Sequence, residues 1–255
     1  MKTTRPPLPS FPVATAQPSR ASHWHYWRTD TAGIVELASW HGGGSLGLRP
    51  HFHDEAQLVF VLAGARSFLI GNRAITVSAG KAACIPAHVL HAPLANGTAE
   101  TRCLNLYLPA TGATDSLRVV DIREHWRITE GTGIRPAAVL RDFDALSPTI
   151  GNPERPKRED DSLRLALTTS RGRIGDLAAS LGRSREDFSR RVSHAVGVAP
   201  HRFRLLARLN LARRLLRADE PIAAVAAETD FADQSHLGRL FRATFGTTPG
   251  RYRHG

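Results

Sequence analysis

Two histidines separated by one residue are the first feature of this sequence that could do chemistry. His51 and His53 lie in the stretch HFHDEAQ, which ends at Gln57. In an extended strand, residues i and i+2 point to the same side, so both imidazoles are expected to face one spot. Imidazole nitrogens bind transition metals and also hydrogen-bond to organic molecules. The stretch therefore predicts a pocket, and it leaves open whether a metal or a small organic ligand occupies it.

The segment that must position these histidines is predicted to be an all-β barrel or sandwich. Short apolar runs broken by Gly, Pro and Asn recur evenly, as such folds require: GIVELASW, AQLVFVLAG, RSFLIG, RAITVSAG, KAACIPA and TRCLNLYLP. Gly71-Asn72 predicts a hairpin turn between two of these runs. Cys84 and Cys103 are too few for a disulfide framework, so we expect two buried thiols in a cytosolic protein.

Two flanking segments have a different composition. Residues 1–21 are rich in proline and are interpreted as a disordered tail without the apolar region of a signal peptide. Residues 111–161 are interpreted as a connecting segment, with weak helical periodicity at 116–126 and a linker rich in proline and charge at 147–161. No apolar run approaches the roughly 20 residues that cross a bilayer, so we expect no membrane partner.

Helical periodicity replaces the β pattern from residue 162 onward. Apolar residues at 174, 177, 178 and 181 predict a short helix that ends at Gly182. Ser184, followed by Asp187 three residues later, predicts the capped start of a second helix. Two short helices joined by a turn that contains glycine are typical of a helix-turn-helix unit.

A long helix after Pro200 leads to a second unit of the same kind. Leucine and alanine residues at 205, 209, 212 and 216 give this helix one apolar stripe. Its arginines, including Arg213 and Arg217, are expected on the other faces. Beyond it, Asp233 is expected to cap a second candidate recognition helix, which ends at Gly246.

The positive charge of the chain is concentrated in this helical part. Residues 162–255 hold 17 Lys and Arg against 8 Asp and Glu, which accounts for +9 of the total of +11. A basic surface on a compact domain suits a polyanion such as DNA. A solvated surface in an arginine-rich sequence would have the same composition, so charge alone does not decide between the two.

Residues 162–254 resemble the DNA-binding domain of the AraC/XylS family of bacterial transcription regulators. The resemblance rests on two segments of the sequence, LGRSREDFSRRVSHAVGVAPHRF and IAAVAAETDFADQSHLGRLFRATFGTTPGRYR. Asp230 departs from the glycine that the family has in the second turn, and aspartate tolerates the left-handed conformation needed there. Arg183 and Arg191 occupy positions that are apolar in the family. The resemblance implies an all-α domain in which two helix-turn-helix units are joined by one long helix.

In such units the outward side of the recognition helix meets base edges in the major groove. The residues expected there are Arg185, Glu186, Ser189, Arg190, Gln234, Ser235, His236 and Arg239. Arginine suits guanine, glutamine suits adenine, and glutamate accepts from cytosine. For each residue taken singly, a phosphate contact or a solvated side chain is the alternative.

Residues 45–96 resemble the two motifs of the cupin fold. The first is His51-x-His53-x3-Gln57 with Gly64, and the second is Gly80-x5-Pro86 with His91. The resemblance implies a cupin-like ligand pocket formed by His51, His53, Gln57 and His91. The same four residues are the candidate ligands of a divalent metal. Gln57 stands where the family has glutamate, which removes both a negative ligand and a general base.

These observations predict two domains: an N-terminal all-β cupin-like barrel at 22–110 and a C-terminal all-α DNA-binding domain at 162–255. The function expected is a cytoplasmic, sequence-specific transcription regulator controlled by a small ligand or metal, and not an enzyme. Its expected partners are double-stranded promoter DNA and a small-molecule effector. RNA polymerase and a second copy of the chain are further candidates. The competing hypothesis is a cupin metalloenzyme, a dioxygenase or isomerase, fused to a helical DNA-binding domain.

Overall fold

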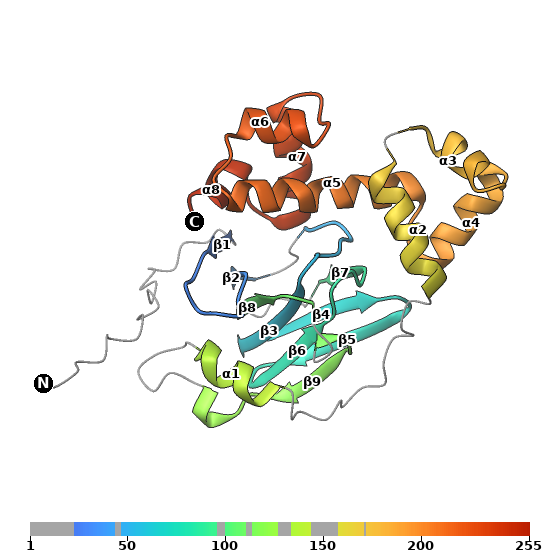
Figure 1. The fold of residues 1–255 in the computed structure, drawn as a ribbon. Coiled ribbons are helices and arrows are strands. Elements are labelled where there is room, and N and C mark those ends of the chain that lie inside the picture. The colour runs from blue at the N-terminus through green and yellow to red at the C-terminus, as the bar shows by residue number, and fades with distance from the viewer. Residues whose placement is uncertain are drawn as a thin grey trace, which may run out of the picture.

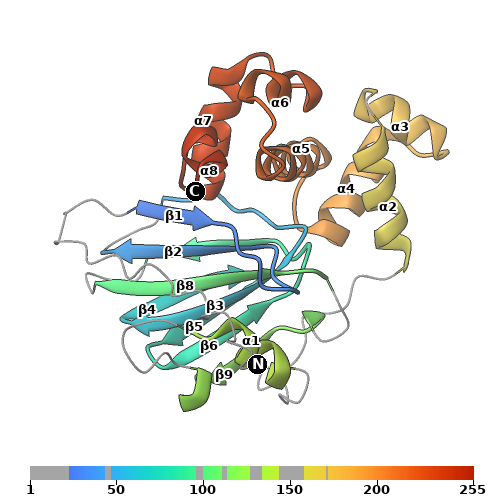
Figure 2. The same ribbon diagram turned by 60° about the vertical axis from the view of Figure 1, so that its left-hand side comes forward.

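The computed structural model describes residues 23–43, 47–95, 100–110, 114–126, 134–143, 158–170 and 172–255. The tail expected at 1–21 and residues 147–157 of the linker expected at 147–161 lie outside these ranges. Figures 1 and 2 show β-sheets on one side of the molecule and a layer of helices on the other. Within the described part of the chain, no helix has the length and apolar character needed to cross a membrane.

The N-terminal half consists of two antiparallel sheets, which confirms the predicted all-β architecture. One sheet has the strand order β1-β2-β8-β3-β6-β9 and the other has the order β5-β4-β7. The strands are β1 (His23–Trp27), β2 (Glu36–Gly42), β3 (Ala56–Ala63), β4 (Ala65–Ile70), β5 (Arg73–Ser78), β6 (Lys81–Ile85), β7 (His91–Leu94), β8 (Thr101–Leu108) and β9 (Arg118–Asp121). The predicted hairpin joins β4 to β5, and Gly71 in its turn has a φ of 59°.

The central strand β3 has apolar residues on both faces, and each face belongs to a different core. Leu58 and Phe60 pack into the core beneath Trp126 and α1 (Pro136–Phe143). Val59 and Val61 point to the other face, whose core continues into the helical domain. This alternation follows from the period of two in a β-strand. The six-stranded sheet is therefore covered on both faces.

The connecting segment differs from its predicted helical character. Where weak helical periodicity was found, at 116–126, residues 118–121 form β9, which pairs with β6 at the edge of the large sheet, and the short 3-10 helix Glu124–Trp126 follows. Pairing with an open sheet edge satisfies backbone groups that a short helix would leave exposed at its ends. The first helix of the C-terminal half, α2 (Arg158–Thr169), begins inside the segment that we interpreted as a linker.

The C-terminal half is entirely helical, as predicted. Its remaining helices are α3 (Ile174–Ser180), α4 (Arg185–Val196), α5 (Pro200–Arg217), α6 (Ile222–Glu228), α7 (Gln234–Phe245) and α8 (Pro249–Arg253). The apolar stripe of α5 is buried at Leu209, Ala212 and Leu216, whereas Leu205 is half-buried. Figure 2 shows α5 between α2–α4 on one side and α6–α8 on the other. The long helix thus holds the two helix-turn-helix units apart.

The N-terminal half packs directly on α5 and α7. The ring of Phe52 stacks on that of Phe203, with 5.2 Å between the ring centroids. The side-chain amide of Asn210 donates to the carbonyl oxygen of Phe52 over 3.0 Å. The hydroxyl of Tyr26 donates to the carbonyl oxygen of Phe245 over 2.9 Å. Because these contacts are buried and close-packed, a shift of the N-terminal half would displace α5 and α7.

Candidate functional site

The two candidate recognition helices, α4 and α7, start and end in the same way. The Ser184 side chain accepts a hydrogen bond from the backbone N–H of Asp187, and that of Asp233 accepts from the backbone N–H of His236. Both helices end at a glycine in the left-handed conformation, Gly197 and Gly246. These caps confirm the predicted starts of both recognition helices and the predicted end of the second at Gly246.

The residues departing from the family pattern are accommodated without disturbing either unit. Asp230 has a φ of 59°, which is the left-handed conformation predicted for this turn. Arg183 and Arg191 both lie within hydrogen-bonding distance of Asp187, at 3.0 and 3.2 Å. One carboxylate on the first turn of α4 thus holds the two arginines where apolar residues would otherwise pack.

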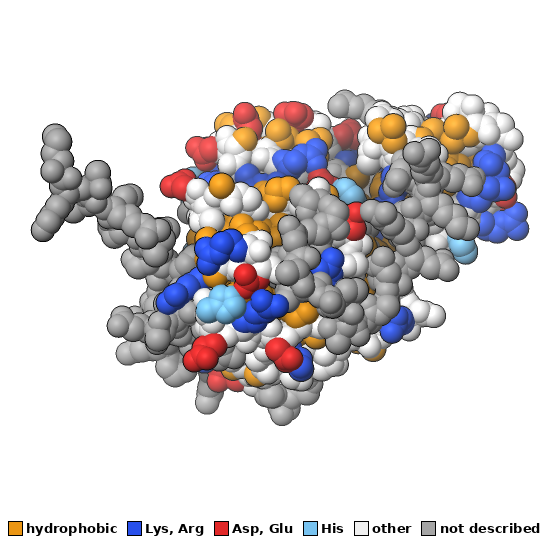
Figure 3. Space-filling view, turned by 60° about the horizontal axis from the view of Figure 1, so that its bottom comes forward, with side chains coloured by type: hydrophobic (Ala, Val, Ile, Leu, Met, Phe, Trp, Pro, Cys, Tyr) orange, Lys and Arg blue, Asp and Glu red, His pale blue; other side chains and the backbone are white. Residues whose placement is uncertain are grey.

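The predicted DNA-reading residues lie on the outward sides of α4 and α7. Two of them, Ser189 and His236, are half-buried, and the other six are exposed: Arg185, Glu186, Arg190, Gln234, Ser235 and Arg239. In Figure 1 the two units stand at opposite ends of α5, and Figure 3 shows basic side chains gathered at the end formed by α3 and α4. This arrangement presents two separate polar helix faces to a partner.

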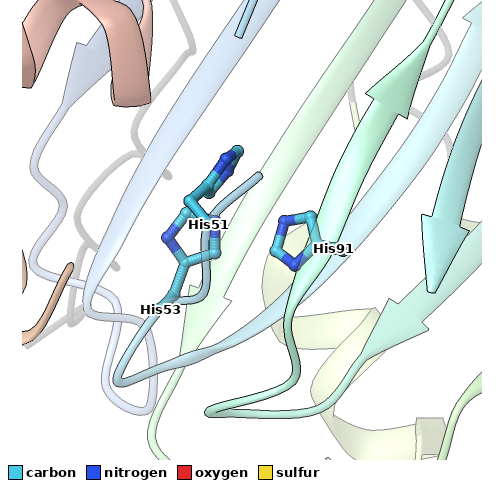
Figure 4. Close-up of side chains that lie close together, drawn as sticks. All are labelled: His51, His53 and His91. Atoms are coloured by element: carbon cyan, nitrogen blue, oxygen red, sulfur yellow. The ribbon is translucent and has the colours of Figure 1, made fainter. Parts of the chain in front are cut away.

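The three histidines of the cupin-like motifs come together in the sensor, as predicted. His51, His53 and His91 are buried, and each offers a ring nitrogen within 4.8 Å of the others. The rings face one another in Figure 4. The strand expected at residues 51–53 is not formed; His51 makes only an isolated bridge with His91, because Asp54 and Glu55 turn the chain toward α5.

Hydrogen bonds to the ring nitrogens define which atom of each histidine carries the proton. Burial lowers the pKa of His51 to about 3 and that of His91 to about 4, and it holds the pKa of His53 well below its usual value. All three rings are therefore neutral. The Nδ1 atoms of His51 and His91 lie 2.7 and 3.0 Å from backbone carbonyl oxygens, so these atoms are the donors. Their Nε2 atoms keep the lone pair.

His53 has the opposite arrangement, which argues against a three-histidine metal site. Its Nδ1 lies 2.9 Å from Nη1 of Arg213, and a guanidinium can only donate. The proton of the neutral His53 ring is therefore on Nε2, and neither nitrogen has a free lone pair for a metal. The fourth cupin position is Gln57, whose amide nitrogen donates to Oδ1 of Asn105 over 3.0 Å. These donors do not fit a resident divalent cation.

The donor set leads to a prediction for metal binding. We expect Gln57→Glu to bind Zn²⁺ about tenfold or more tightly than the unsubstituted chain, because a carboxylate supplies the missing negative ligand. Calorimetric titration of the chelator-treated chains with Zn²⁺ measures the difference. His91→Ala introduced beside Gln57→Glu should abolish the gain. Retention of one equivalent of metal by the unsubstituted chain after chelator treatment would contradict this account.

A buried ionic cluster joins the sensor to α5 next to His53. Nη1 of Arg213 lies 3.4 Å from Oε2 of Glu55, and its Nη2 is paired with Glu36. Arg217 adds contacts of 3.6 Å to Glu36 and 2.5 Å to Glu55. The hydroxyl of Tyr252 on α8 donates to Glu36. We call Glu36, Glu55, Arg213, Arg217 and Tyr252 the interdomain cluster.

The interdomain cluster corrects the expectation that the arginines of the long helix cover its outer faces. Arg213 is only 1% exposed, and Arg217 is mostly buried. Both arginines face the N-terminal domain because Glu36 and Glu55 there neutralise them. The periodicity of α5 does not reveal these two distant partners. A signal was available in the sequence, since Arg213 follows the buried Ala212 and lies within one turn of Leu209 and Leu216. Sequence reasoning also missed Arg66, a buried arginine near the start of β4.

Comparisons with known proteins agree with this geometry. A helix-turn-helix domain model matches residues 177–255, and a cupin domain model matches residues 37–107. The probable transcriptional regulator LumQ of Photobacterium leiognathi is 24% identical over 230 residues, which cover 80% of this chain and 91% of LumQ. The transcriptional activator NphR of a Rhodococcus species is 41% identical over 81 residues, 31% of this chain, and the match spans about a quarter (24%) of NphR.

A solved structure shares the whole fold. ToxT from Vibrio cholerae strain SCE256, with an unsaturated fatty acid bound, aligns with a TM-score of 0.54 at 12% identity, covering 89% of this chain and 97% of ToxT. Together, the cupin sensor and the paired helix-turn-helix units define a one-component transcription regulator. These comparisons confirm the resemblance to AraC/XylS-type transcription regulators that carry a cupin-like domain on the N-terminal side.

Proposed function

We propose that the chain binds promoter DNA by placing α4 and α7 in the major groove. The observation that carries this proposal is the pair of capped helices at the two ends of α5, each with its polar face outward. Direct base contacts are assigned to the eight residues predicted from the sequence: Arg185, Glu186, Ser189, Arg190, Gln234, Ser235, His236 and Arg239. The exposure of most of these side chains and the positive charge of the domain support the assignment.

The assignment predicts different consequences for two arginines of equal charge. Arg239→Ala should weaken binding to the preferred sequence by about 1–3 kcal/mol and relax the preference at one base position, because a base contact is lost. Arg102→Ala, at an exposed position of β8, removes the same charge outside both helix-turn-helix units and should leave the preference unchanged. Competition binding with single-base variants of a selected DNA sequence measures both. An unchanged preference in Arg239→Ala would refute the assignment.

We further propose that a small organic effector in the cupin-like pocket controls DNA binding through the interdomain cluster. His51, Gln57, His91 and Tyr107 are among the residues that line the cavity. The guanidinium group of Arg213 also lies over the ring of Tyr107, 4.3 Å from the ring centroid. A ligand that moves Tyr107 or the histidines thus acts directly on the residue that fastens α5 to the sensor. Such a ligand binds the DNA-binding conformation and the non-binding conformation with different affinity. It therefore shifts the population between these two conformations.

A regulatory role accounts for the pocket better than catalysis does. Gln57 replaces the glutamate that would serve a cupin enzyme as general base, and an amide does not accept a proton at neutral pH. In ToxT the same fold holds a fatty acid, and the full-length relative LumQ is a probable transcriptional regulator. We infer that this chain is no enzyme and that it acts in the cytoplasm, where promoter DNA is found. RNA polymerase and a second copy of the chain stay predicted partners.

A further inference from the structure

A buried arginine lines the cavity of the cupin-like domain. Arg66 on β4 is 3% exposed, and the enclosed space beside it has a volume of about 10 Å³, which is room for about one water molecule. Its guanidinium carbon lies 5.5, 5.4 and 5.2 Å from the ring centroids of Trp24, Trp40 and Phe68. Three aromatic rings therefore surround this charge inside the barrel.

Arg66 differs from the equally buried Arg213 in its partners. Arg213 is neutralised by Glu36 and Glu55. Among the residues that the structure describes, no carboxylate forms an ion pair with Arg66. Its Nη1 donates only to the sulfur of Cys103, over 3.6 Å, and its Nε has no hydrogen-bond acceptor there. The three aromatic rings compensate this buried charge only in part, so an anion that enters the cavity would find a strong partner in Arg66.

The other residues that line the cavity determine which kind of anionic ligand it suits. Leu48, Phe68, Trp24 and Pro93 supply an apolar lining. The Nε2 atoms of His51 and His91 keep their lone pairs, so they can accept hydrogen bonds from a hydroxyl group. The chemistry of these walls suits a compact molecule with one charged end and an apolar body. Because the enclosed space is only about 10 Å³, such a molecule must displace lining side chains when it enters.

We propose that Arg66 is the anchor of a small organic carboxylate, which is the effector of this regulator. This inference rests on the proposed ligand control of DNA binding. A guanidinium presents two parallel N–H donors that match the two oxygens of a carboxylate. The aromatic rings around Arg66 exclude water from this pair and strengthen it. The same positive charge, close to His51 and His91, is a further reason why the pocket disfavours a divalent cation.

The test compares acids with their uncharged amides. Benzoate, benzamide, hexanoate and hexanamide are titrated into the full chain, with tryptophan fluorescence as the readout because Trp24 and Trp40 flank Arg66. We expect at least one acid to bind about tenfold or more tightly than its amide. Arg66→Met should remove that difference, and Arg102→Met, which removes an exposed charge elsewhere in the sensor, should keep it. If no acid binds better than its amide, or if Arg66→Met binds the acid unchanged, the proposal is overturned.

A second measurement does not depend on the choice of ligand. Without a ligand, Arg66→Met should have a higher melting temperature than the unsubstituted chain, because methionine removes an uncompensated buried charge while filling similar space. A clear fall in melting temperature would show that Arg66 is satisfied by the protein itself and would overturn the proposal. An acid that binds through Arg66 without changing the affinity for DNA would support this anion site and refute the proposed effector control.

Discussion

Replacing Arg213 with methionine is expected to destabilise the chain by about 3–5 kcal/mol, since the substitution leaves two carboxylates buried without their partner. Glu36 and Glu55 are 2% and 7% exposed, and Arg217 alone cannot neutralise both. The loss should appear in urea denaturation followed by circular dichroism. Because the cluster joins the two halves, we also expect proteolytic cleavage between the sensor and the helical domain to become faster.

The neighbouring arginine provides a matched control. Arg214 is half-exposed and pairs with Asp54 at the rim of the same interface, so Arg214→Met should cost about 1 kcal/mol or less. Replacing Glu36 with glutamine in the Arg213→Met chain should recover part of the lost stability, because the remaining carboxylate, Glu55, is still paired with Arg217. Equal losses for Arg213→Met and Arg214→Met would show that the cluster does not fasten the domains.

Gly246→Ala is the second substitution for which we expect a large effect. Gly246 ends α7 with a φ of 78°, and a Cβ atom there would lie 2.1 Å from Cδ1 of Trp24 in the sensor. A left-handed alanine costs about 1–2 kcal/mol and overpacking typically adds about 1–3 kcal/mol. We therefore expect a loss of about 2–5 kcal/mol in the free energy of unfolding, measured by urea denaturation.

Gly238 in the middle of α7 is the control for this substitution. A Cβ at Gly238 would meet nothing within 4 Å, so Gly238→Ala should stabilise the chain by about 0.5–1 kcal/mol through its helix propensity. Trp24→Ala should reduce the cost of Gly246→Ala, since it removes the atoms with which the new methyl group collides. If Gly246→Ala is as harmless as Gly238→Ala, β1 does not pack against the end of the recognition helix.

Local patterns in the sequence were sufficient for the elements that depend on local physics. The apolar run that forms β3, the hairpin at Gly71 and the capped starts at Ser184 and Asp233 all follow from local sequence patterns and short-range hydrogen bonds. The exposure of the predicted DNA-reading residues follows in the same way, because the opposite face of each recognition helix is apolar. Leu181 is an exception: it was assigned to an apolar face but is 44% exposed, beside the turn at Gly182.

Contacts between distant segments were beyond such patterns. Arg213 and Glu36 are far apart in the chain, and nothing near either residue indicates that they meet. The histidines of the cupin-like motifs were correctly expected to converge, but the role of His53 depends on the guanidinium of Arg213, which determines where the histidine proton is. Likewise, Arg66 is a single charged residue at the start of an apolar run in the sequence. Only the side chains that surround it in the fold make it a candidate ligand anchor.

The most direct test of a regulator that reads DNA with two helices of one chain is selection from a pool of randomised DNA. The account predicts that the full chain enriches an asymmetric site with two preferred segments about 10 base pairs apart, because α5 holds α4 and α7 over successive major grooves. Arg190→Ala should weaken the preference in one segment and Arg239→Ala that in the other. Enrichment of a single segment, or of no sequence at all, would contradict the account.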